Sequence, residues 1–165
     1  MNQPSQPVNA MLYAAELGRG CEDALAYAIR LGKQLGATLR VVAVIGDERE
    51  TSVVEVDSYV PQGALNQYHD NHAKRVKERL EAQIAAFSAE CPDLNIDTTV
   101  YEIKVREGDD VAQLILAEAQ AIPTDMILLG TTHHEHPVLE FLFGSVVQDV
   151  IRRSAVPVLL VPGCD

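Results

Sequence analysis

The chain has 165 residues, of which 47% are hydrophobic and 22% charged, a composition typical of a globular domain that buries a sizeable core. Its net charge of −11 argues against nucleic-acid binding, because attraction to phosphates requires an excess of lysine and arginine. No apolar run approaches the roughly 18 residues that a membrane-spanning helix needs, so we expect no membrane insertion.

The first seven residues are polar and proline-rich, and they lack the basic and apolar regions of a signal peptide. We therefore predict a disordered lead-in at residues 1–9, a single domain at residues 10–165, and a cytoplasmic location. The three cysteines are far apart and form no CxxC pair, as expected for reduced thiols in a reducing compartment.

The first half of the chain alternates short apolar runs with helical patterns. Residues 11–15 predict a strand, residues 22–36 a helix that ends at a glycine, and residues 38–45 a β-branched strand buried on both faces. Residues 46–63 are acidic and irregular, which is typical of a loop. Residues 65–91 then predict a long helix, and its apolar stripe contains Ala73, Val76, Leu80, Ile84 and Phe87.

The second half continues the alternation. Residues 96–105 alternate apolar and polar side chains late in the run, which favours a strand near the edge of a sheet. Strands are also predicted at residues 126–129 and 156–161, with a helix at residues 145–153 between them. The remaining helix opens at Gly108-Asp109 and stops before a proline, and we expect its inward residues to be Val111, Leu114, Ile115 and Ala119.

This order of five strands and four helices predicts an α/β fold. Strands separated by helices imply right-handed crossovers and an open five-stranded parallel sheet with helices on both faces. In the strand order 3-2-1-4-5, the first and fourth strands flank the point where ligands bind in such sheets. Glu16 and Gly130 would then face the same crevice.

A glycine-bearing loop follows the strand at residues 126–129. It begins at Gly130, contains His133, His134 and His136, and leads to Gly144-Ser145 at the start of a helix. A glycine after a buried strand, followed by a free helix N-terminus, is a typical anion site in α/β folds. A helix-capping role for the Gly-Ser pair is equally compatible with the sequence.

Several of these motifs resemble the universal stress protein family over most of the chain. The matching residues are Gly130, Gly144-Ser145, the helix at 146–153, the last strand at 157–161, the Gly108-Asp109 helix start and the Ala-Leu-Ala-Tyr-Ala opening of the first helix. The resemblance implies a Rossmann-like sheet of the adenine nucleotide α-hydrolase type. It also implies a stress-response regulatory module that forms a homodimer through residues 156–161, an apolar strand whose prolines suit a sheet edge.

The resemblance further implies a site for ATP or AMP, with Mg²⁺ accompanying ATP. Carried onto this chain, the site comprises Ala15, Glu16, Val44, Gly130, Thr131, His133, Gly144, Ser145 and Val146. Two departures stand out: Glu16 replaces the family's aspartate, and His133 replaces its second loop glycine in a loop that is one residue longer. Paired histidines after the first glycine resemble a branch that does not bind ATP. The alternative is therefore a nucleotide-free interaction protein whose loop histidines fill the pocket.

Catalysis and metal binding are disfavoured by what the sequence lacks. Ser145 has no nucleophile elbow and no evident partner acid, so we expect no enzyme beyond slow ATP hydrolysis. Imidazole is a common zinc ligand, which makes His133, His134 and His136 the candidates for a metal site. No cysteine or second histidine cluster is close in sequence to complete a tetrahedron, so a solvated polar loop is favoured.

Overall fold

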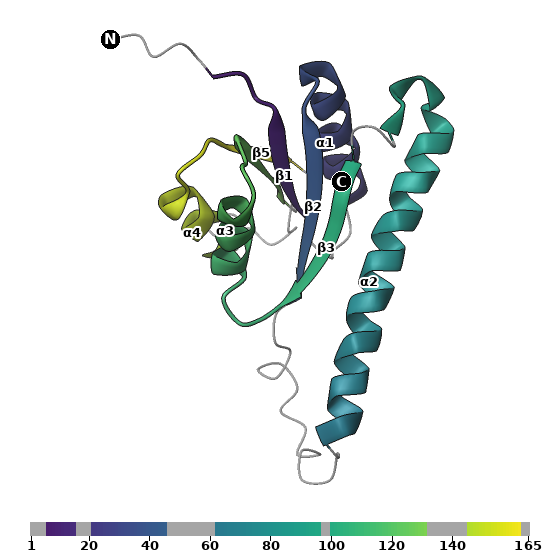
Figure 1. Cartoon of the computed structure of the whole chain (residues 1–165), viewed down its shortest axis with the longest axis vertical. Coiled ribbons are helices and arrows are strands. Elements are labelled where there is room, and N and C mark those ends of the chain that lie inside the picture. Colours follow the sequence, from purple (N-terminus) through teal and green to yellow (C-terminus); the bar gives the residue numbers. More distant parts are fainter. Residues whose placement is uncertain (1–5, 16–20, 46–61, 97–99, 132–144, 163–165) are drawn as a thin grey trace, which may run out of the picture.

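A computed structural model describes residues 6–15, 21–45, 62–96, 100–131 and 145–162. Within these ranges five strands alternate with four α-helices, and a short 3₁₀ turn precedes the third strand (Figure 1). The elements are β1 (Ala10–Ala15), α1 (Cys21–Leu35), β2 (Thr38–Ile45), α2 (Gln62–Glu90), η2 (Pro92–Leu94), β3 (Val100–Glu107), α3 (Val111–Ala121), β4 (Met126–Thr131), α4 (Ser145–Arg153) and β5 (Val158–Pro162).

The five strands form one parallel sheet in the order β3-β2-β1-β4-β5, which confirms the predicted topology. The chain leaves β1 toward β2 on one side, and β4 is followed by β5 on the other, so the strand order reverses between β1 and β4. The start of this central pair is fixed by Asp125, whose carboxylate accepts hydrogen bonds from the backbone N–H groups of Asn9 and Ala10 at 2.8 and 3.0 Å.

Helices cover both faces of the sheet, as predicted. α1 and α2 lie on one face and α3 and α4 on the other (Figure 1). β1 serves both cores, because its side chains alternate: Met11 and Tyr13 pack with α1 and α2, whereas Leu12 and Ala14 pack with α3 and α4. The central strands are therefore buried on both sides, which explains why their sequences are nearly continuous apolar runs.

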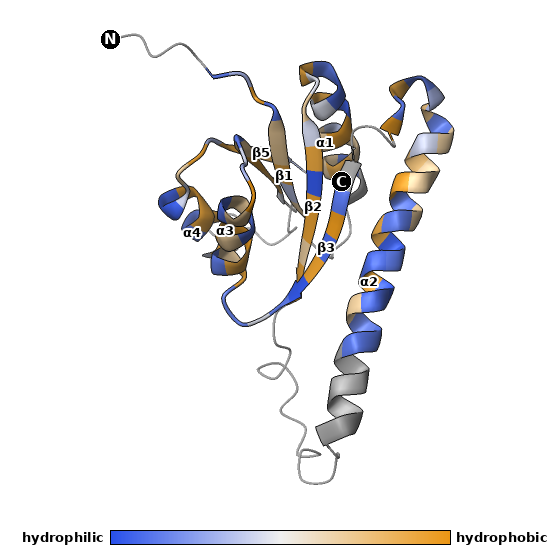
Figure 2. Cartoon of the chain, viewed as in Figure 1, coloured by the Kyte–Doolittle hydropathy of each residue, from blue (hydrophilic) through white to orange (hydrophobic). Residues whose placement is uncertain are grey.

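α2 follows the predicted stripe. Val76, Leu80 and Ile84 are buried at helical spacing, and Ala73 and Phe87 pack beside them. The rest of the helix surface is mostly hydrophilic, as the colouring in Figure 2 shows. The helix begins at Gln62, three residues earlier than predicted.

Strand boundaries differ from the prediction at β3, β4 and β5, and β5 begins at Val158, two residues later than predicted. β3 begins at Val100 rather than at residue 96, because the chain first makes the η2 turn and Asn95 adopts a left-handed conformation with φ 50°. β4 extends through Gly130 to Thr131, so this glycine lies within the strand and does not terminate it.

The buried face of α3 also differs from the prediction. The buried residues are Ala112, Ile115, Leu116 and Glu118, whereas Val111, Leu114 and Ala119 are only partly buried. Asp110 caps the helix by accepting a hydrogen bond from the N–H of Gln113 at 2.8 Å. The helix therefore begins at Val111, later than Gly108-Asp109 suggested.

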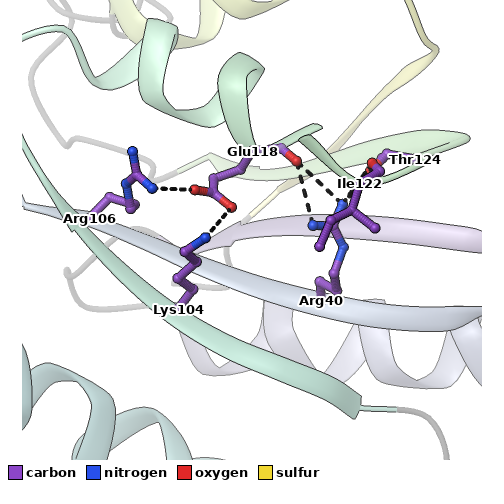
Figure 3. A network of polar contacts seen from close by, with 6 residues as sticks. All are labelled: Arg40, Lys104, Arg106, Glu118, Ile122 and Thr124. Atoms are coloured by element: carbon purple, nitrogen blue, oxygen red, sulfur yellow. Dashed lines mark hydrogen bonds and ion pairs between the residues drawn. The ribbon is translucent and has the colours of Figure 1, made fainter. Parts of the chain in front are cut away.

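A buried polar network ties α3 to β2 and β3 (Figure 3). The guanidinium of Arg40, which is buried in β2, donates to the backbone carbonyls of Glu118 and Ile122 and to the hydroxyl of Thr124. It thereby satisfies carbonyl groups at the end of α3 that have no partner within the helix. The carboxylate of Glu118 in turn accepts from Lys104 at 3.2 Å and Arg106 at 2.8 Å, both on β3.

Candidate functional site

The carboxyl ends of β1, β2 and β4 lie side by side at the same end of the sheet. Ala15, the last residue of β1, lies opposite Ala43 of β2, and Val44 follows it. On the other side Ala14 pairs with Leu129, which places Gly130 beside Ala15. Four predicted site residues, Ala15, Val44, Gly130 and Thr131, are therefore brought to adjacent strand ends at the point where the strand order reverses, which is where open α/β sheets bind ligands.

Three of the residues at these strand ends have a small side chain or none. Ala15 and Ala43 are buried alanines, and Gly130 has no side chain at all. At these positions the backbone is therefore not covered by large side chains. A ligand can approach such strand ends closely and be held by main-chain donors.

Gly130 is required by packing rather than by an unusual backbone angle. A Cβ atom built on this residue would lie 3.1 Å from the Cβ of Ala24 in α1 and 3.8 Å from the hydroxyl oxygen of Tyr13. The first distance shows that α1 rests directly on the end of β4, and the second is an ordinary contact with β1. Sequence reasoning assigned Gly130 to phosphate approach and missed Ala24, whose place on the apolar face of the first helix was the available signal.

The start of α4 supplies the other described part of the site. The helix begins at Ser145, which is exposed, and Val146 packs against the core that contains Ala14 and Leu129. The first N–H groups of a helix have no partner within it and carry a partial positive charge. Ser145 and Val146 thus bring anion-binding potential to the helix that follows β4.

Three predicted site residues, Glu16, His133 and Gly144, lie outside the described residues, as do His134 and His136. The expectation that the three histidines form a solvated loop rather than a metal site consequently stays a prediction. Among the residues that the structure does describe, no group of three or more histidine, cysteine, aspartate or glutamate side chains is arranged to hold a metal ion. No helix in the same ranges combines the length and apolarity needed to cross a membrane.

Comparison with protein-family models gives a match to the universal stress protein family over residues 8–162. The chain belongs to the universal stress protein family. This family assignment confirms the resemblance inferred from the glycine motifs, and it covers every strand and helix described above. A comparison with curated proteins gives no significant match.

Solved structures of universal stress proteins share the fold. UspA from Lactobacillus plantarum has a TM-score of 0.68 at 16% identity, covering 95% of this chain and 99% of its own. A universal stress protein in complex with cAMP has a TM-score of 0.53 at 18% identity, covering 96% and 100%. The protein from Archaeoglobus fulgidus in complex with dAMP has a TM-score of 0.53 at 18% identity, covering 94% and 98%.

Proposed function

We propose that this universal stress protein binds an adenine nucleotide, ATP or AMP, at the carboxyl ends of β1, β2 and β4, and that it acts as a cytoplasmic stress-response regulatory module. The observation that carries the proposal is the junction of Ala15, Val44 and Gly130 at the reversal of strand order. Two structural neighbours with the same fold hold adenine nucleotides, cAMP in one and dAMP in the other.

The proposed contacts follow from the groups at the carboxyl ends of these strands. Backbone N–H groups in the first turn of α4 would bind the phosphates, and Gly130 and Thr131 would allow their close approach, which suits an acidic chain with few basic side chains. The backbone at Val44 would meet the base, and the carboxylate of Glu16 the ribose. Mg²⁺ would enter only together with ATP, as a ligand of its phosphates.

We propose a binding rather than a catalytic role. Of the described residues at the strand ends, Ala15, Ala43, Val44 and Gly130 offer no general base or nucleophile, and Thr131 has only a hydroxyl group. Any ATP hydrolysis would therefore be slow. The nucleotide would act by changing the protein's shape or surface for a partner.

The test is to ask whether the protein carries nucleotide when it is purified. Heating the native protein, removing the precipitate and separating the supernatant by chromatography should release an adenine nucleotide, and millimolar ATP should raise the melting temperature. No released nucleotide together with no thermal shift would favour the alternative: a nucleotide-free interaction protein. His133 and the longer loop are the sequence features that motivate that alternative.

We also propose a homodimer through β5. This strand is at the edge of the sheet, and its residues Val158, Leu159 and Leu160 are apolar and only partly buried. An apolar edge strand tends to pair with another strand. The strand at the opposite edge, β3, carries the charged residues Glu102, Lys104 and Arg106. Charged side chains on an edge strand disfavour dimerisation by pairing of two copies of β3.

A further inference from the structure

β3 is an edge strand of the sheet, and its two faces differ in chemistry. It pairs with β2 on one side, and no strand in the described part of the chain pairs with its other side. Ile103 and Val105 pack toward α2, whereas Lys104 and Arg106 reach Glu118 of α3 on the opposite face. The alternation of hydrophobic and hydrophilic residues along the strand is visible in Figure 2.

A groove of about 530 Å³ lies between α2 and β3. Ile84 and Ile96, both buried, form part of its lining, and Ile103 belongs to β3 itself. The α2 side contributes small side chains, with Ala85 and Ala89 exposed. The other lining residues are Glu81 and Ser88. Because alanine and serine leave this space unfilled, the groove can accept apolar side chains from outside.

The opposite face of β3 carries two accessible cations, Lys104 and Arg106, after the exposed Glu102 at the start of the strand. Lys104 and Arg106 share the single carboxylate of Glu118, at 3.2 and 2.8 Å (Figure 3). The Glu118 side chain is 5% exposed, whereas those of Lys104 and Arg106 are 40% and 39% exposed. Two accessible cations on one buried carboxylate can take a further acidic partner. Glu102 lies toward the start of the strand, next to the irregularity in its pairing with β2.

We propose that the edge of β3 and this groove bind an extended peptide segment of a partner protein whose side chains alternate between apolar and acidic. The peptide would add a strand to the sheet through its backbone. Alternate side chains of a strand point to opposite faces. Apolar ones would therefore enter the groove, and acidic ones would meet Lys104 and Arg106. The same cations disfavour a wholly apolar strand, which would remove their exposed parts from water and offer no carboxylate besides that of Glu118.

The proposal is tested with the full-length protein and a fluorescein-labelled peptide of sequence Ser-Val-Glu-Val-Glu-Val-Glu-Ser. We expect saturable binding by fluorescence anisotropy, and no binding of a peptide with lysine in place of each glutamate. In hydrogen exchange, the amides of β3 should exchange more slowly when the peptide is bound. This binding is independent of the nucleotide, so it should persist in nucleotide-free protein.

Two variants and one control locate the binding. Ala85→Arg fills the groove and should weaken binding about tenfold or more, whereas Ala82→Arg, an exposed position on the same helix outside the groove lining, should leave it unchanged. Lys104→Gln removes one cation and should weaken binding about threefold, with a smaller salt dependence. Absence of saturable binding, equal affinity for the lysine peptide, or equal effects of the two alanine variants would each overturn the proposal. If Ala85→Arg fails to fold, Lys104→Gln and hydrogen exchange on the wild type decide the question.

Discussion

Replacing Gly130 by alanine tests whether the end of β4 must lack a side chain. The added Cβ would lie 3.1 Å from the Cβ of Ala24, whereas carbon atoms pack best at about 3.5–4.0 Å. β4 and α1 must therefore separate by about half an ångström. Overpacking of this kind costs about 1–3 kcal/mol. Removing the conformational freedom of glycine in a strand offsets about 0.5–1 kcal/mol of that cost.

The expected net effect is a loss of about 1 kcal/mol in the free energy of unfolding, or about 2–4 °C in melting temperature for a domain of this size. Urea denaturation of four proteins, the wild type, Gly130→Ala, Ala24→Gly and the double variant, measures the contact directly. Ala24→Gly alone should cost about 1 kcal/mol through helix propensity.

In the Ala24→Gly background the Gly130→Ala change no longer meets a Cβ atom, so it should become neutral or stabilising. The resulting coupling energy between the two positions should be about 1–2 kcal/mol. An equal loss of stability from Gly130→Ala in both backgrounds would refute the explanation of this glycine by its contact with α1.

Three further predictions concern the polar network of Arg40 and Glu118 and the edge strand β5. Arg40→Met should lower the free energy of unfolding by about 2–3 kcal/mol in urea denaturation, because it removes the donor to the Glu118 carbonyl and the Thr124 hydroxyl and one of the two donors to the Ile122 carbonyl. Exposed Lys33→Met is the control, expected to change the free energy of unfolding by less than about 0.5 kcal/mol. Glu118→Gln should lower the free energy of unfolding by about 1–2 kcal/mol; the loss is limited because water partly solvates Lys104 and Arg106. This loss should be smaller at high salt, and a loss that does not depend on salt would show that packing dominates instead. Val158→Lys at the edge strand β5 should convert the proposed dimer to a monomer in sedimentation velocity at a temperature where the variant is folded, and an unchanged sedimentation coefficient would contradict dimerisation through this strand.

Sequence patterns were sufficient where one local signal dominated. The strand at residues 38–45 is β-branched and nearly continuous, and the helix at residues 145–153 opens at a serine after a glycine. The alternation of strands and helices then determined the sheet order, because right-handed crossovers leave few topologies.

The features that were missed depend on contacts between distant residues. α3 is almost wholly apolar, so periodicity did not distinguish its inward face, and the burial of Glu118 depends on cations in β3. Arg40 is a charged residue in an apolar strand, and its partners lie 78 to 84 residues away in the sequence. The role of Gly130 likewise follows from its contact with Ala24: the helical pattern places Ala24 on an apolar face but does not show that this face meets the end of β4.

The most direct test of nucleotide binding is calorimetric titration of nucleotide-free protein with ATP and AMP, comparing the wild type with Ser145→Glu and Gln148→Glu. Both variants add one negative charge at an exposed position of α4, but only position 145 is at the helix N-terminus. Acidic residues there are tolerated or stabilising in a free helix, so folding should be preserved. We predict saturable binding to the wild type and to Gln148→Glu, and a loss of about tenfold or more in Ser145→Glu through repulsion of the phosphates. No heat of binding in the wild type, or equal affinities in all three proteins, would contradict the proposed site.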